Sequence, residues 1–232
     1  MHFLIEEHRR VGLLLGSSGC GKSLLLEIIA RRVRAWGRAA AKLSLLGAQP
    51  DDFLATLLDQ LHIVVPDKAP LWRKWQCLER RFRENRYQKL ETVILLDDVD
   101  EATPDVLTQV ARIAKYDLTP DSRLTVILAG ETDRVGRIGE TLLELVELRI
   151  DVPAWEADDT AGFLTRALEQ AGGQPSVIDH EAARRMHELA DGSPRRVRQL
   201  ADLALLAAAG SNLDTVNVDT VEAACEQLGV MA

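Results

Sequence analysis

The stretch that decides the fold is Gly16-Ser-Ser-Gly-Cys-Gly-Lys-Ser23, which follows the apolar run Val11-Gly-Leu-Leu-Leu15. A glycine, four residues and then Gly-Lys-Ser is the complete pattern of a phosphate-binding P-loop between a strand and a helix. The glycines let successive backbone N–H groups face phosphate oxygens, and the following helix adds the positive end of its dipole. The stretch therefore predicts a nucleotide-binding protein, and we expect the nucleotide to be ATP.

The residues of this loop have separate expected roles. Lys22 should reach the β- and γ-phosphates, and the Ser23 hydroxyl should ligate Mg²⁺. Cys20 occupies a variable position, and we favour a tolerated small side chain over a redox-sensitive thiol there. The predicted nucleotide-contacting residues are Gly16, Ser17, Ser18, Gly19, Cys20, Gly21, Lys22, Ser23 and Leu24.

A second motif is the apolar run Thr92-Val-Ile-Leu-Leu96, which ends in Asp97 and Asp98. Phosphoryl transfer needs a carboxylate near Mg²⁺ and a group that orients the attacking water. Two adjacent carboxylates at a buried strand end are costly without a cation. We assign Asp97 to the Mg²⁺ shell and Asp98 to the water. Glu101 is an alternative base, which we disfavour because it lies beyond the strand end.

The pattern of elements changes along the chain. Strand and helix patterns alternate at first, which predicts a parallel sheet with right-handed crossovers, and only helical patterns follow. The expected strands cover residues 11–15, 39–46, 92–96, 123–129 and 146–152. The expected helices cover residues 24–36, 71–89, 158–170, 179–190, 194–209 and 218–228, and two more begin at Pro50 and Pro104. We expect an α/β P-loop domain over residues 1–155 and a helical lid over residues 156–232.

Composition excludes some classes of protein. The net charge of −8 argues against unselective nucleic-acid binding by the whole surface. The three cysteines show no metal-site spacing and cannot all pair within one chain, which indicates a reducing compartment. The sequence shows no signal peptide and no apolar run of about 18 residues, so we expect a cytoplasmic protein without a transmembrane segment.

The segment of residues 71–89 is locally basic, with seven Lys or Arg and two Glu residues, a local charge of +5. Trp72, Trp75, Leu78 and Phe82 recur there at helical spacing, and we expect them to face the sheet. A solvated charged face is the simpler interpretation of the basic residues. Contact with the phosphate backbone of DNA is the alternative.

Other polar residues are candidates for sensing the γ-phosphate. The strand that ends at Ala129 is followed by Glu131 and Thr132, and either one suits this role. Arg195 begins a helix after Gly192-Ser-Pro194 and is a candidate to reach the γ-phosphate from the lid. An arginine finger would come from a neighbouring subunit. The sequence does not choose among the candidate fingers Arg134, Arg137 and Arg149.

This order of motifs resembles an AAA+ ATPase, and more narrowly the ExeA/GspA-type ATPases and the related TnsC-type transposition regulators. Three further stretches resemble that branch: residues 3–8 before the first strand, Leu148–Pro153 with the acids after it, and Ala190–Leu200. The resemblance implies ATP hydrolysis that drives conformational change and ATP-dependent homo-oligomers. Asp98 replaces the Glu of most such ATPases and is one methylene shorter, which implies either slow hydrolysis or a water that sits closer.

Two functions follow from these observations. The first is an ATP-hydrolysing motor or assembly factor of the ExeA/TnsC kind. The second is a nucleotide-gated binding module with little turnover, a switch or a DNA-binding regulator. The stretch Leu95-Leu-Asp-Asp-Val99, which also resembles the Walker B strand of STAND switch ATPases, suits the second function.

Overall fold

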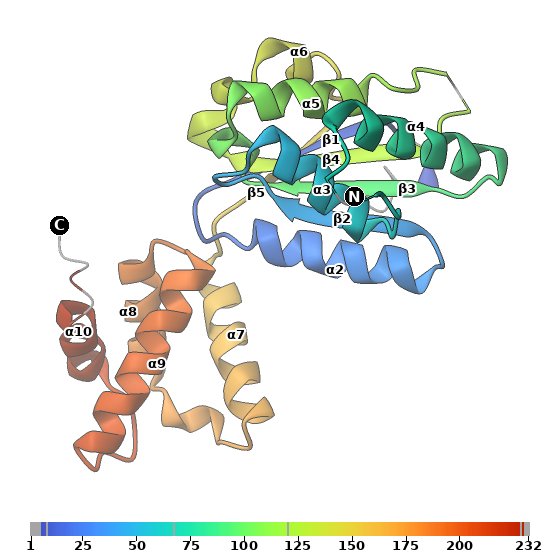
Figure 1. Cartoon of the computed structure of the whole chain (residues 1–232). Helices are drawn as coiled ribbons and strands as arrows, with labels where there is room; N and C mark the ends of the chain where they lie inside the picture. Colours follow the sequence, from blue (N-terminus) through green and yellow to red (C-terminus); the bar gives the residue numbers. More distant parts are fainter. Residues whose placement is uncertain (1–5, 8, 67, 120, 228, 230–232) are drawn as a thin grey trace. The chain divides into compact units, whose positions relative to one another are not determined.

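The computed structural model describes residues 6–7, 9–66, 68–119, 121–227 and 229 (Figure 1). It divides the chain into two compact units. The first comprises the residues up to Gly16 together with Lys22–Val152, and the second comprises Ser17–Gly21 and the residues from Pro153 onward. The predicted lead-in, residues 3–8, lies outside the described residues except for Glu6 and Glu7.

The first unit is built on a five-stranded sheet with the strand order β2-β3-β4-β1-β5. All neighbouring strands are parallel, so the predicted α/β fold is confirmed. The strands are β1 (Val11–Gly16), β2 (Ala39–Ser44), β3 (Thr92–Asp97), β4 (Leu124–Glu131) and β5 (Leu148–Val152). Because the strands are parallel, their carboxyl ends share one edge of the sheet, where the P-loop and the two acids follow β1 and β3.

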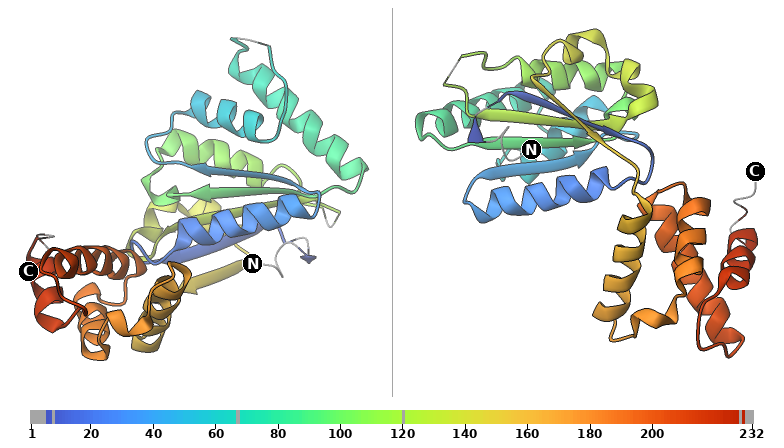
Figure 2. Two further views of the ribbon diagram at one scale, coloured as in Figure 1. Left: turned by 90° about the horizontal axis from the view of Figure 1, so that it is seen from below. Right: turned by 180° about the vertical axis from the view of Figure 1, so that it is seen from behind.

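Alternate residues of each strand pack on opposite faces of the sheet, as the pleat of a strand requires. On one face Leu14, Val93 and Leu95 join Leu26 and other residues of α2 (Lys22–Ala35) in one buried cluster. On the other face strand residues pack with α3 (Pro50–Gln60), α4 (Leu71–Tyr87) and α5 (Pro104–Ala114) (Figures 1 and 2). The short helix α6 (Glu140–Leu143) contributes Leu142 to this second cluster.

Helix α4 buries one stripe of side chains, but the prediction for Trp72 was wrong. Trp75, Leu78 and Phe82 are buried, whereas Trp72 is 65% exposed. An α-helix turns about 100° per residue, so Trp72 lies 60° from Trp75 and 120° from Leu78, outside the buried stripe. Trp75 donates from Nε1 to the side chain of Gln109 on α5 across 2.8 Å, which fixes α4 beside α5.

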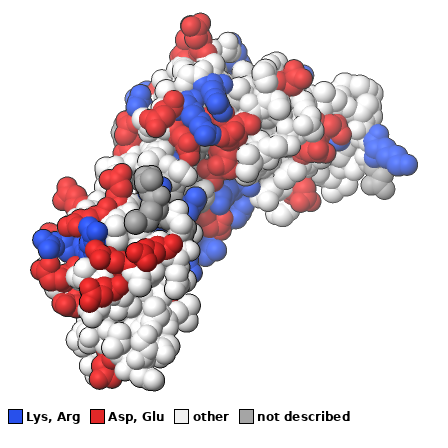
Figure 3. All heavy atoms as spheres, turned by 90° about the vertical axis from the view of Figure 1, so that its left-hand side faces the viewer, with Lys and Arg blue, Asp and Glu red and all other residues white. Residues whose placement is uncertain are grey.

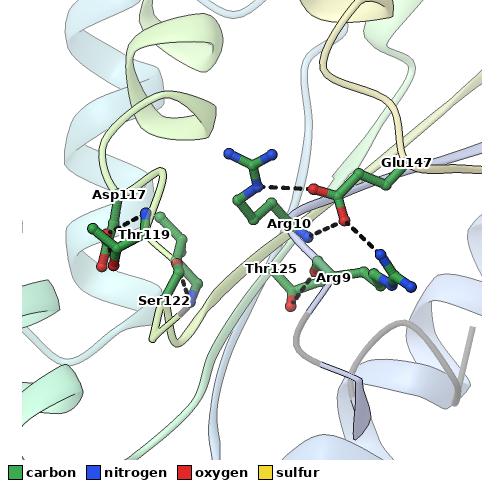
Figure 4. Close-up of polar contacts among 8 residues, drawn as sticks. Arg9, Arg10, Asp117, Thr119, Ser122, Thr125 and Glu147 are labelled. Carbon is green, nitrogen blue, oxygen red and sulfur yellow. Dashed lines mark hydrogen bonds and ion pairs between the residues drawn. The ribbon is translucent and has the colours of Figure 1, made fainter.

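At the edge of the sheet opposite the P-loop, Glu147 joins the starts of β1 and β5 (Figure 4). Its carboxylate accepts from the backbone N–H of Arg10 at 3.3 Å and from Arg10 Nε at 2.8 Å. The guanidinium of Arg9 lies 4.0 Å away, and Thr125 Oγ1 donates to the Arg9 carbonyl. These contacts hold the beginning of β1 between β4 and β5.

Within its described residues, the second unit contains four α-helices and the short 3₁₀ helix Pro175–Val177, with a buried core that includes Met186, Val197 and Leu200 (Figure 2). The α-helices are α7 (Ala157–Gln170), α8 (His180–Ala190), α9 (Pro194–Gly210) and α10 (Val218–Gln227). Glu156 and Asp159 form a reciprocal capping box at the start of α7. The predicted helical character of the C-terminal region is therefore confirmed, and none of the described helices is long and apolar enough to cross a bilayer.

Candidate functional site

The P-loop joins β1 to α2, as the sequence predicts, but the helix begins at Lys22 and not at Leu24. Lys22 is 9% exposed, and its Nζ donates to the carbonyl of Gly16 at 3.0 Å. Gly19 and Gly21 have positive φ angles of 78° and 102°, which side chains with a Cβ rarely adopt. The backbone therefore uses the glycines as a phosphate-binding loop requires.

The other loop residues differ in exposure. Cys20 is buried, and its backbone N–H donates to the Ser17 carbonyl. Ser17, Ser18, Ser23 and Leu24 are exposed. Because the first turn of α2 leaves N–H groups without intrahelical partners, this exposed end of the helix suits an anionic ligand.

Asp97 and Asp98 lie at the carboxyl end of β3 with different surroundings. Asp97 is 4% exposed and accepts the Asp98 backbone N–H at 3.2 Å. Asp98 adopts a left-handed conformation, with φ 54° and ψ 39°, and is partly exposed. Its Oδ2 accepts from the hydroxyl of Ser44, at the end of β2, across 2.6 Å. The sequence reasoning missed Ser44, because only the strand order brings it beside Asp98.

Asp100 is a third carboxylate near this edge, and the sequence analysis gave it no role. It is 4% exposed, and its Oδ1 accepts the backbone N–H of Glu131 at 3.1 Å. Its Oδ2 is buried and has no hydrogen-bond partner among the described residues. Glu131 ends β4 and stands in register with Gly16. Asp100 thus links the segment after β3 to the end of β4, the strand that pairs with β1.

Glu101 and two of the candidate arginine fingers, Arg134 and Arg137, form a separate ionic cluster. Arg134 contacts Glu101 and lies 3.5 Å from Glu131, and Arg137 lies 3.9 Å from Glu101. Arg149 instead pairs with Asp151 on its own strand, and this hydrogen bond raises the pKa of the guanidinium. All three arginine side chains are at least 42% exposed, so their choice as a finger stays a prediction.

Thr132 and Arg195, the candidates for sensing the γ-phosphate besides Glu131, both have exposed side chains. Thr132 begins the 3₁₀ segment Thr132–Ile138 directly after β4. Arg195 is in the first turn of α9, and its backbone N–H donates to the Gly19 carbonyl at 3.3 Å within the second unit. The roles of both residues stay predictions.

The donor set fits a magnesium ion that is shared with nucleotide phosphates. Among the described residues, no group of three or more His, Cys, Asp or Glu side chains is placed to hold a metal. Mg²⁺ commonly takes one or two protein oxygens and completes its octahedron with phosphate oxygens and water. The buried carboxylate of Asp97 and the exposed hydroxyl of Ser23 supply oxygen donors of that kind.

Most basic residues of α4 have acidic partners, including Arg86 in its last turn, which lies 3.2 Å from Asp117. Lys74 pairs with Asp51 at 2.8 Å, and Arg80 and Arg81 lie near Glu84. The end of the helix borders a hollow of about 470 Å³. It is lined by Arg83, Arg86, Tyr87, Lys89, Asp121 and Arg123. By contrast, acidic and basic side chains are interspersed on the face shown in Figure 3.

A protein-family model described as "AAA domain" matches residues 5–138. A curated relative, general secretion pathway protein A of Aeromonas hydrophila, is 23% identical over 94% of this chain. The chain spans 41% of that protein's length.

Solved structures share the fold at low sequence identity. Cdc6p of Pyrobaculum aerophilum has a TM-score of 0.77 and 15% identity, over 97% of this chain and 63% of its own. The RuvB Holliday junction branch migration motor of Thermotoga maritima has a TM-score of 0.67 and 17% identity, over 98% and 66%. The ADP form of Aeropyrum pernix ORC2 has a TM-score of 0.69 and 14% identity, over 100% and 67%.

Proposed function

Because the chain belongs to the AAA domain family, we propose that it binds Mg²⁺·ATP in the P-loop and hydrolyses it to change its own assembly or its contacts with a partner. The observation that carries this proposal is the shared sheet edge, where Lys22 lies against Gly16 and the acids Asp97 and Asp98 end β3. This combination supplies a phosphate cradle, a cation and two carboxylates.

Each residue has a distinct task in the proposed reaction. Lys22 exchanges its contact with the Gly16 carbonyl for phosphate oxygens, where its charge stabilises the transition state. Asp97 and Ser23 hold Mg²⁺, which neutralises phosphate charge when it is bound. Asp98 orients the attacking water. Glu101 is in contact with Arg134 and Arg137 beyond the end of β3, so we favour Asp98 over Glu101 as the residue that orients the water.

The test compares nucleotide affinity and phosphate release in Lys22→Ala and in a matched lysine variant. Lys115, an exposed residue at the end of α5, supplies the control Lys115→Ala. We expect Lys22→Ala to bind ATP at least 10-fold more weakly and to lose turnover, with Lys115→Ala unchanged. Equal ATP affinity in wild type and Lys22→Ala contradicts the proposed site.

We propose further that ATP promotes homo-oligomers in which Arg134, Arg137 or Arg149 reaches the site of a neighbour. The exposure of these side chains supports this. The molar mass in solution should rise when a slowly hydrolysed ATP analogue is added. A mass equal to that of the monomer at all protein concentrations contradicts the proposed assembly.

A second candidate function is nucleotide-dependent DNA binding, supported by the basic hollow at the end of α4. Four cations line it, and Tyr87 at its rim is 90% exposed and available for stacking on a base. Arg83 and Lys89 form no ion pair with an acidic side chain within the described part of the chain.

The DNA test compares basic residues at the end of α4 and just beyond it with a paired lysine in the first turn of the helix. Changing Arg83 and Lys89 together to Ala should weaken binding to duplex DNA and reduce its salt dependence. Lys74→Ala is the matched control, because Lys74 is paired with Asp51. Absence of salt-sensitive binding at micromolar protein, with and without an ATP analogue, excludes this function.

Negligible turnover together with tight ATP binding would instead indicate a nucleotide-gated switch.

A further inference from the structure

Asp100 is a buried carboxylate that the proposed reaction does not use directly. It is 4% exposed, and one of its oxygens has no hydrogen-bond partner among the described residues. A buried carboxylate with incomplete hydrogen bonding destabilises a fold. A buried carboxylate that lowers stability in this way calls for an explanation, and a role in function is one.

The other oxygen of Asp100 holds the end of the neighbouring strand. Oδ1 accepts the Glu131 backbone N–H at 3.1 Å, and Glu131 pairs in register with Gly16, the first residue of the P-loop pattern. Thr132 follows immediately. The carboxylate therefore fixes the backbone of Glu131 and Thr132, the two γ-phosphate sensor candidates at the end of β4.

Gly130 makes this contact feasible. A Cβ at Gly130 would lie 2.7 Å from Asp100 Oδ1 and 3.4 Å from Asp100 Cγ. Since real Cβ atoms essentially never approach so closely, a larger residue at position 130 would force the carboxylate away from Glu131. Asp100 and Gly130 thus form one structural unit.

We infer that Asp100 is a positioning residue of the site, which holds Glu131 and Thr132 beside the P-loop through the Glu131 backbone N–H. The inference rests on the proposed function. It assigns Asp100 a role through the Glu131 backbone, and it assigns Gly130 the role of making room for the Asp100 carboxylate.

The test is a double-mutant cycle on ATP turnover, with ATP affinity measured in parallel. Asp100→Ala should lower kcat at least 10-fold while the Kd for ATP stays within 3-fold of wild type. Asp100→Asn, which keeps an oxygen acceptor for the Glu131 N–H, should retain kcat within 3-fold. Gly130→Ala should lower kcat like Asp100→Ala. The double variant, Asp100→Ala with Gly130→Ala, should have a kcat no lower than that of Asp100→Ala alone. The carboxylate that a Cβ at position 130 would clash with is then absent.

Other outcomes overturn the inference. Wild-type turnover in Asp100→Ala, equal losses in Asp100→Asn and Asp100→Ala, or multiplied losses in the double variant each contradict it. If Asp100→Ala does not fold, Asp100→Asn and Gly130→Ala decide. If the wild-type protein neither binds nor hydrolyses ATP, the proposed function is wrong as well. That outcome differs from a failure of the inference about Asp100, because it is measured before any residue is changed.

Discussion

The hydroxyl of Ser44 donates a hydrogen bond to the carboxylate of Asp98 across 2.6 Å, from the end of β2 to the end of β3. In the strand order β2-β3-β4-β1-β5, β2 and β1 lie on opposite sides of β3. The contact therefore turns Asp98 toward β2, away from the strand that carries the P-loop. In the proposed reaction, Asp98 must leave Ser44 to orient a water at the γ-phosphate.

Removing the Ser44 hydroxyl should speed hydrolysis. One such hydrogen bond contributes about 1 kcal/mol, so Ser44→Ala should raise kcat by about 5-fold at saturating ATP. Phosphate release measures this, and Ser176→Ala is the control because Ser176 is an exposed serine of the helical unit. A fall in kcat in Ser44→Ala would mean that Ser44 assists Asp98.

The contacts of Glu147 should stabilise the fold without affecting chemistry. Glu147→Gln weakens partly exposed ion pairs to Arg9 and Arg10, which should cost about 1 kcal/mol. For a chain of this size that lowers Tm by about 2–4 °C. Asp151→Asn breaks an exposed pair on β5 and should shift Tm by less than about 1 °C. Equal shifts in the two variants would contradict this assignment.

The buried pair of Asn85 and Thr92 should show an asymmetric loss. Asn85 Nδ2 donates to Thr92 Oγ1 at 2.8 Å, and both residues are at most 8% exposed. Thr92→Val leaves the Asn85 amide without its partner, which costs about 1–3 kcal/mol. Adding Asn85→Leu to Thr92→Val should recover part of that loss in chemical denaturation. A double variant less stable than Thr92→Val would contradict the pairing.

The sequence predicts the sheet well because its signals are local. Apolar runs such as Val93–Leu96 end in glycine or acid at the carboxyl edge, and the structure confirms five parallel strands. The predicted AAA membership is also confirmed by the family match over residues 5–138. The prediction for Trp72 failed because regular spacing identifies a helix more reliably than it identifies which residue at the helix end is buried.

The parts of the site that the sequence missed depend on strand order. Ser44 is 54 residues from Asp98, and Asp100 is 31 residues from Glu131. Nothing in the local pattern of either residue indicates its partner. Both pairs form because β2 and β4 flank β3, which strand patterns alone do not determine.

The most direct test of the proposed ATPase is steady-state phosphate release by Asp98→Asn, with ATP affinity measured on the same preparation. We predict a loss of at least 10-fold in kcat with the Kd for ATP within 3-fold of wild type, because in the proposed reaction Asp98 orients water and does not hold the nucleotide. Glu101→Gln, the matched acid-to-amide change in the same segment, should keep most of the activity. Full turnover in Asp98→Asn, with loss in Glu101→Gln, would contradict this role of Asp98.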